Sequence, residues 1–213
     1  MTGQPIFNRL ALIGMGLIGS SIARAARAQG AARSIVATAR SAATRRRLAE
    51  LGLTDHVVET NAAAAEGADL VIVAIPVGAC GAVAAEIGPH LAPGAIVSDV
   101  GSVKGAIVRN MSPHLPAGVH FVPAHPVAGT ENSGPDAGFA ELFVDRWCIL
   151  TPPSNVEPAA VERLAAFWRL LGANVEIMSA EHFQHCVLIG EKDIAPHGRI
   201  RGRDAGEIAE AAG

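Results

Sequence analysis

Three glycines near the N-terminus constrain the fold of this 213-residue chain more than any other feature. Gly14, Gly16 and Gly19 have the spacing G-x-G-x-x-G, directly after the apolar run LALIG and directly before an alanine-rich amphipathic segment. In a strand–turn–helix unit, the first glycine permits a tight turn, the second lets the backbone approach a pyrophosphate, and the third lets helix and strand pack closely. We therefore expect a βαβ unit whose helix N-terminus faces a dinucleotide, the alternative being a glycine turn without a ligand.

Short β-branched runs alternate with longer alanine-rich runs along most of the chain. The apolar runs are nearly continuous in hydrophobicity, as in a parallel sheet that is covered on both faces. Strands are expected at residues 10–14, 34–40, 56–59, 70–76, 95–101, 119–124, 148–152 and 174–178, and helices at 17–29, 41–51, 77–90, 103–113 and 157–171. This alternation predicts an α/β fold with a doubly wound, mostly parallel Rossmann-type sheet.

The sequence also predicts where the domain ends and where some helices begin and stop. Residues 1–178 are expected to form the dinucleotide-binding domain, and residues 179–213 a short C-terminal segment that ends in a solvated tail or frayed helix. Ser41 and Ser102 stand where helix N-caps belong, and Gly52 stands where a C-cap belongs.

Composition narrows the class of ligand. The formal net charge of −3 and the pI near 6.2 provide no basic field for nucleic acid, and no apolar run reaches the length of a membrane span. Cys80, Cys148 and Cys186 are far apart and form no C-x-x-C motif, which fits a reducing cytosol. His182 and His185 would share a helix face but lack a clear third ligand, so no metal site is expected. A small-molecule ligand and a cytoplasmic location are the expectation.

The end of the second strand bears on the choice of cofactor. NAD-selective sites place a carboxylate there to bind the ribose, whereas this chain has Ala39, Arg40 and Ser41. Arg40 with Ser41 or Thr44 would bind a 2′-phosphate, which favours NADP over NAD. The alternative is that Arg40 belongs to a solvated helix face, as we expect for the run from Arg45 to Arg47.

Later strands are expected to end at the same edge of the sheet, where open α/β sheets bind ligands. The stretch VIVAIPV brings the backbone of Ile75, Pro76 and Val77 there, and HFVPAHPVAGTENSG brings His125. Between them, SDVGSVKG places Asp99, Ser102 and Lys104 around a glycine turn. Together with the fingerprint, the expected cofactor residues are Gly14, Gly16, Leu17, Ile18, Gly19, Arg40, Ser41, Ile75, Pro76 and Val77.

These stretches resemble the prephenate and arogenate dehydrogenases of tyrosine biosynthesis. The similarity covers about residues 8–185 through GMGLIGSS, VIVAIPV, SDVGSVKGAIV, FVPAHPVAGTENSG and LFVDRWCILTP, and the H-P-x-A-G-T-E-x-S-G stretch is its most specific part. The resemblance implies that His125 accepts a hydrogen bond from the ring hydroxyl and that Ser102 helps hold hydroxyl and histidine together. It further implies substrate contacts from Thr130 and Glu131, use of NADP or NAD, and a homodimer.

The implied chemistry suits these residue types. Oxidation of a secondary alcohol requires a base near the hydroxyl while hydride leaves the same carbon, and an unperturbed imidazole titrates close to neutral pH. Loss of the ring carboxylate as carbon dioxide gives an aromatic product, so the protein has mainly to orient the reactants. The alternatives are that His125 is a structural histidine with a backbone partner and that Ser102 is only a helix cap, although a serine can do both.

The resemblance stops near residue 186, before the helical domain that the family uses as its dimer interface. The family continues with a second histidine-containing segment and an arginine that binds the substrate carboxylate. The surroundings of His197 do not match that segment, and no motif gives the carboxylate-binding role to Arg199, Arg201 or Arg203. Either truncation or a frame shift removed the usual continuation, or the chain is a short form that uses its tail differently.

Two other functions stay open at this point. One is a dinucleotide-binding remnant without catalysis. The other is a different hydroxy-acid dehydrogenase, which would need a catalytic lysine on a glycine-rich helix, while the lysines of this chain are Lys104 and Lys192.

Overall fold

A computed structural model describes residues 4–188, the side chains of residues 185–188 excepted. The expected charged tail lies outside the described residues, as do the side chains of His185 and Cys186. Lys192, His197, Arg199, Arg201 and Arg203 are part of that tail.

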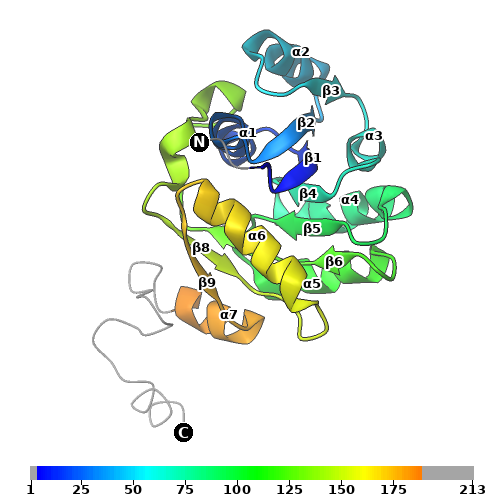
Figure 1. The fold of residues 1–213 in the computed structure, drawn as a ribbon, viewed down its shortest axis with the longest axis vertical. Coiled ribbons are helices and arrows are strands. Elements are labelled where there is room, and N and C mark those ends of the chain that lie inside the picture. The colour runs from blue at the N-terminus through cyan, green and yellow to red at the C-terminus, as the bar shows by residue number, and fades with distance from the viewer. Residues whose placement is uncertain (1–3, 189–213) are drawn as a thin grey trace, which may run out of the picture.

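The described residues form two sheets and the helices that cover them (Figure 1). The strands are β1 (Phe7–Ile13), β2 (Ala32–Thr38), β3 (His56–Val58), β4 (Leu70–Val73), β5 (Ile96–Asp99), β6 (His120–Phe121), β7 (Ala124–Pro126), β8 (Trp147–Leu150) and β9 (Asn174–Ile177). The α-helices are α1 (Leu17–Gln29), α2 (Ala42–Leu51), α3 (Asn61–Ala65), α4 (Cys80–Ile87), α5 (Lys104–Met111), α6 (Pro158–Leu170) and α7 (Ala180–Leu188).

The first sheet is parallel throughout, with the strand order β3-β2-β1-β4-β5-β6. In β1, Leu10 and Leu12 pack with α1, α2 and α6 on one face, while Ala11 and Ile13 pack with α3, α4 and α5 on the other. Successive side chains of a strand point to opposite faces, so a strand covered on both faces is apolar throughout. The predicted doubly wound fold is confirmed, and its strand order reverses between β1 and β4, where such sheets bind ligands.

The apolar run at 119–124, expected as one strand, is two strands in two sheets. The Val122 N–H still donates to Val97 O beside β5, at 2.9 Å, but Pro123 has no N–H to continue that pairing. Its carbonyl instead accepts from Thr151 N, at 2.9 Å, and β7 then runs antiparallel to β8. The second sheet has the order β7-β8-β9, with β9 parallel to β8. Its first strand carries His125.

Local signals at helix ends were accurate in α2 and wrong in α5. Ser41 Oγ accepts from Thr44 N at 3.0 Å, and Gly52 ends α2 in the left-handed conformation with φ 59°. Ser102 does not cap α5, because the helix begins at Lys104 with Val103 at the N-cap and no side-chain cap hydrogen bond. The hydroxyl of Ser102 is therefore not committed to the backbone of this helix.

Candidate active site

The glycine loop has the geometry that its spacing predicts. Gly14 adopts φ +92°, and a Cβ there would collide with the carbonyl of Ala74 at the end of β4. A Cβ on Gly19 would collide with the carbonyl of Gly14, so the first turn of α1 packs directly on the loop. A Cβ on Gly16 would meet no atom within 4 Å. The outer glycines are thus required by packing, whereas Gly16 leaves open space before the N-terminus of α1.

That open space belongs to a cavity of about 750 Å³ at the carboxyl edge of the parallel strands. Six of the ten residues expected to bind a cofactor line it: Gly14, Gly16, Arg40, Ser41, Ile75 and Pro76. Gly19 lies beneath the loop, and Leu17, Ile18 and Val77 pack against the two cores. The structure therefore brings the β1, β2 and β4 ends together around one space.

The sequence analysis missed several lining residues, among them Ala79, Val83 and Glu86 at α4 and the two groups described next. Glu59, Thr60 and Asn61 follow β3 and form part of the wall, and the strand-end rule applied to 56–59 would have found them. Gly134 and Pro135 also line the cavity, although they belong to the stretch that begins at His125. No local signal assigns those two residues to the dinucleotide side, because their position depends on the path of the loop.

A set of polar contacts holds that loop across α1 and α2. Arg47 on α2 forms a forked ion pair with Asp136, with Nη2 to Oδ1 at 2.6 Å and Nε to the two carboxylate oxygens at 3.0 and 3.2 Å. The Phe139 N–H donates to Ser21 Oγ on α1 at 3.1 Å, and Gly138 lies so close to Ser20 that a Cβ would collide with it. Gly134 and Pro135 are thereby fixed over the cavity.

The arginines after β2 have distinct roles in the structure. Arg45 Nη1 donates to the carbonyls of Ala39 and Arg40, at 2.8 and 3.2 Å, and so holds the turn that presents Arg40 to the cavity. Arg46 is exposed. The expectation of a purely solvated face from Arg45 to Arg47 was incomplete, since Arg45 bonds to the turn that contains Arg40 and Arg47 bonds to Asp136 of the loop that follows Pro135.

The expected substrate residues lie outside the cavity lining. His125 is in β7 with 8% of its surface exposed, and its ring meets the edge of Phe183 of α7 at a centroid distance of 5.3 Å. Ser102 is exposed after β5, while Thr130 and Glu131 are exposed in the loop after β7. Thr130 Oγ1 accepts from Asn132 N at 3.2 Å.

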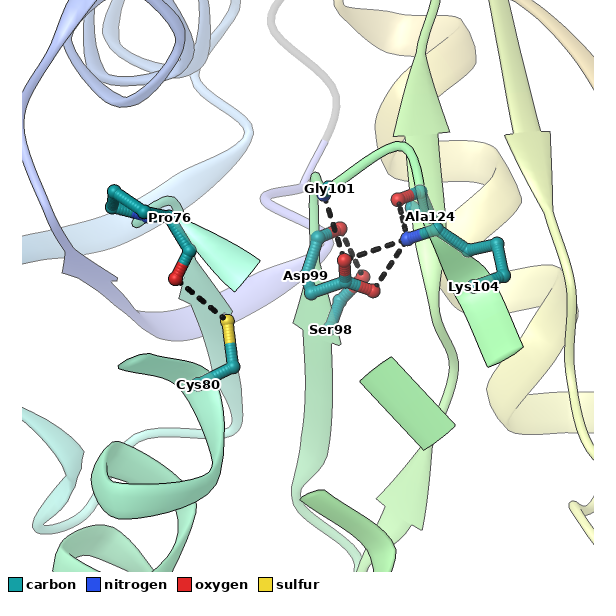
Figure 2. Close-up of polar contacts among 7 residues, drawn as sticks. All are labelled: Pro76, Cys80, Ser98, Asp99, Gly101, Lys104 and Ala124. Atoms are coloured by element: carbon teal, nitrogen blue, oxygen red, sulfur yellow. Dashed lines mark hydrogen bonds and ion pairs between the residues drawn. The ribbon is translucent and has the colours of Figure 1, made fainter. Parts of the chain in front are cut away.

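A buried ion pair of Asp99 and Lys104 connects the end of β5 to Ala124 of β7 (Figure 2). Lys104 Nζ lies 2.7 and 2.6 Å from the two carboxylate oxygens of Asp99, and both side chains have no exposed surface. The same ammonium donates to the carbonyl of Ala124, at 2.5 Å. Asp99 also accepts from Gly101 N, at 2.7 Å. The loop that contains Gly101 and the strand β7 are thus both hydrogen-bonded to this charged pair.

Burial dominates the electrostatics around this pair. Desolvation raises the pKa of Asp99 and lowers the pKa of Lys104, and in each case the charge of the partner opposes the shift. Burial and the charge of Asp99 raise the pKa of Cys80 to about 11, and burial raises the pKa of Cys148 well above its usual range. Both cysteines are free and buried, so neither has the character of a reactive thiolate.

Within the part of the chain that the structure describes, no three His, Cys, Asp or Glu side chains gather as a metal site. Among the same residues, no helix is long and apolar enough to cross a membrane.

The sequence of the chain matches the profile of one known protein family. The profile described as "Prephenate dehydrogenase, nucleotide-binding domain" matches residues 22–177. Its match begins after the glycine loop, so the geometry of that loop is an independent observation.

The curated relatives include a cyclohexadienyl and a prephenate dehydrogenase. A cyclohexadienyl dehydrogenase from Zymomonas mobilis is 42% identical over 184 residues, which are 86% of this chain and 62% of the relative. A prephenate dehydrogenase from Bacillus subtilis is 30% identical over 187 residues, which are 83% of this chain and 50% of the relative. The chain thus spans between half and two thirds of the length of these relatives.

Solved structures of the family share the fold. The arogenate dehydrogenase of Synechocystis superposes with a TM-score of 0.78 at 25% identity, covering 96% of this chain and 73% of that one. The prephenate dehydrogenase of Aquifex aeolicus, solved with hydroxyphenyl propionate and NAD+, gives 0.75 at 26% identity over 94% and 73% of the two chains. On the profile match, the relatives and the shared fold together, the chain belongs to the prephenate dehydrogenase family, of which it contains the nucleotide-binding domain.

Proposed function

We propose that this protein carries out the NAD(P)-dependent oxidative decarboxylation of prephenate or arogenate in tyrosine biosynthesis. The observation that carries the proposal is the joining of two loops: the stretch that begins at His125 continues into Gly134 and Pro135, which line the cavity of the glycine loop. A hydride acceptor in the cavity and a base on β7 would therefore belong to one continuous site.

The residues of the cavity fit a dinucleotide. The open space at Gly16 lets the backbone approach a pyrophosphate at the N-terminus of α1, where the helix dipole favours an anion. Ile75 and Pro76 supply an apolar wall beyond it. When bound there, the nicotinamide would supply the hydride acceptor. We propose residues 1–178 as the dinucleotide-binding domain and residues 179–213 as a separate C-terminal segment.

The ribose end of the cavity favours NADP. Arg40 and Ser41 line it together with Thr44, and no carboxylate stands at the end of β2. Arg45 holds the Ala39–Arg40 turn through its carbonyls. An arginine fork and two hydroxyls are suitable donors for a 2′-phosphate.

On the substrate side, we assign the proton acceptor to His125 and the positioning of the hydroxyl to Ser102. The edge contact with Phe183 limits rotation of the imidazole. Ser102, free of the capping role, retains its hydroxyl proton for a ligand. Thr130 and Glu131 would supply further polar contacts from the loop. Loss of the ring carboxylate then gives the aromatic product.

The test is a spectrophotometric assay of the full chain with prephenate and with arogenate, each with NAD+ and with NADP+. We expect substrate-dependent formation of reduced cofactor, faster with NADP+. His125→Asn should abolish most of this turnover, because it removes the base, while its cofactor affinity stays unchanged. Gln184→Ala, at a half-buried position of α7, is the matched control and should leave both properties unchanged.

The outcomes separate the alternatives. Cofactor binding without turnover of either substrate would favour a dinucleotide-binding protein without catalysis. Full activity of His125→Asn would remove the assigned base. The absence of cofactor binding would contradict the proposal as a whole.

Two wider properties are also proposed. The first is the oligomeric state: the family forms homodimers through a helical domain beyond the part that this chain resembles, and light scattering of the full chain would distinguish a 21.8 kDa monomer from a dimer of twice that mass. The second is a cytosolic location, where Cys80 and Cys148 would stay reduced, and fractionation of cells that make the protein would test it.

A further inference from the structure

The buried pair of Asp99 and Lys104 is the strongest feature of the molecule that the proposed chemistry leaves unused. Both side chains are fully buried, and removing two charges from water has a large desolvation cost. A buried ion pair usually adds little net stability, since apolar side chains of similar volume often stabilise a fold equally well. The position of the pair therefore needs a reason beyond packing.

The contacts of the ammonium indicate that reason. Lys104 Nζ has three donors, and it faces three acceptors: the two oxygens of Asp99 and the carbonyl of Ala124. The bond to Ala124 is the one that reaches another strand. Figure 2 shows this bond, and Ala124 immediately precedes His125 in the chain.

The Ala124 carbonyl requires a donor from outside the sheet because β7 is an edge strand of the β7-β8-β9 sheet. Around His125, the backbone of β7 pairs with β8 through Pro123, Val127 and the register partner Ile149. The carbonyl of the intervening Ala124 points to the other side in an antiparallel pair, where β7 has no strand partner in the described sheets. The ammonium of Lys104 supplies the missing donor.

The same pair shapes the loop that carries Ser102. Asp99 accepts from Gly101 N at 2.7 Å, which turns the chain directly before Ser102. Lys104 follows Ser102 by two residues and begins α5. The loop and β7 are therefore set relative to each other by one carboxylate and one ammonium.

We propose that Lys104 is a positioning residue, which sets His125 relative to the Ser102 loop through its hydrogen bond to the Ala124 carbonyl. The inference rests on the proposed function for its catalytic consequence. Its structural part, the control of the His125 position, is independent of that function. Lys104 does not act as a base or nucleophile here, because Asp99 and Ala124 occupy its ammonium.

Two double variants of the full chain isolate the hydrogen bond. Replacing Lys104 alone would leave Asp99 buried without a cation, so the pair is made neutral in both proteins. Asp99→Asn with Lys104→Met keeps the shape and removes the donor to Ala124. Asp99→Asn with Lys104→Gln is the matched control, which is also neutral but keeps an amide donor.

The first readout does not depend on turnover. The His125 Hε1 resonance, assigned by its loss in His125→Asn, should move in the methionine double variant. It should remain near its wild-type position in the glutamine double variant. His56 and His120 provide reference resonances, and thermal melting reports any general loss of stability.

The second readout compares the change in kcat with the change in the KM for the cofactor. With prephenate, the methionine double variant should lose roughly 10- to 100-fold in kcat, as expected when a reacting group is misplaced by up to about 1 Å. The KM for the cofactor should stay unchanged, because Lys104 does not line the cavity. The glutamine double variant should recover most of the kcat.

Equal His125 resonances in the two double variants would overturn the positioning role, as would equal losses of kcat in both. If the wild-type chain has no turnover with prephenate or arogenate, the proposed function fails, and the resonance comparison alone decides the role of Lys104.

Discussion

The two sides of the site are built differently. The side formed by the glycine loop depends on positions that have no side chain, whereas the side that carries His125 depends on two buried charges, Asp99 and Lys104. At Gly14 and Gly19 a methyl group would collide with backbone, and at Gly16 it would enter the open cavity. On the other side, Asp99 and Lys104 bond to each other and to the strand that carries His125. A methyl group added at Gly14 or Gly19 would disturb the first side, and loss of one charge of the buried pair without the other would disturb the second. Substitutions on the two sides should therefore fail in different ways.

The largest effect is expected from Lys104→Met, which leaves the buried carboxylate of Asp99 without a cation. Breaking a buried pair in this way costs about 3–5 kcal/mol of unfolding free energy. The folded-state pKa of Asp99 is already raised by burial and should rise further, because Lys104 is the cation that opposes the shift. Cys80 and Cys148, the other titratable groups that act on the pair, are neutral while their pKa values are raised.

The sign of the pH dependence follows from that pKa. An Asp with a raised folded-state pKa stabilises the fold below its unfolded value of 3.8, and this contribution is lost as the pH rises. The stability of Lys104→Met should thus fall as the pH rises above about 4, while Asp99→Asn with Lys104→Met should show no such slope. Urea melts at several pH values provide the measurement, and parallel curves for the two variants would contradict this account.

A smaller loss of stability is expected on the dinucleotide side from Gly14→Ala. The backbone at φ +92° costs an L-residue about 1–3 kcal/mol, and the clash with Ala74 adds to that strain. Thermal melting without any ligand should show the change. Gly30→Ala serves as a control for positive φ alone, because a Cβ at Gly30 meets no neighbour within 4 Å. Equal losses in the two variants would mean that the contact with Ala74 is unimportant.

Gly16→Ala should separate binding from folding. Its Cβ meets nothing in the structure, so the melting temperature should stay at the wild-type value. The same methyl group would stand where a pyrophosphate approaches, and we expect the cofactor to bind about tenfold more weakly, or about 1.4 kcal/mol. Fluorescence titration with NADPH measures this change, and wild-type affinity would place the pyrophosphate elsewhere.

The most selective effect is expected from Arg40→Ala. Loss of a charge-assisted hydrogen bond of about 1.5–3 kcal/mol should weaken NADP+ binding by about tenfold or more. NAD+ binding should be unaffected because NAD+ lacks the 2′-phosphate. Arg46→Ala, an exposed neighbour, is the matched control. A parallel loss for both cofactors would show that Arg40 does not distinguish them.

The two sides also differ in how far the sequence predicted them. The glycine spacing predicted the tight turn at Gly14 and the close packing at Gly19, because all three glycines lie within one local unit whose geometry is nearly fixed. The cap at Ser41 was predicted for the same reason. Ser102 looked equally suitable as a cap, but α5 begins at Lys104, with Val103 at the N-cap.

The sequence by itself determined the α/β class, the glycine loop and the stretch that carries His125, since each is encoded by neighbouring residues. Only the tertiary structure decided that the run at 119–124 divides between two sheets and that Gly134 and Pro135 reach the cavity. It also decided that Lys104 bonds to Ala124, which is 20 residues away in the chain. The first feature depends on Pro123, which ends the pairing with β5, and the last depends on the buried contact between Asp99 and Lys104. Neither can be predicted from a local sequence pattern.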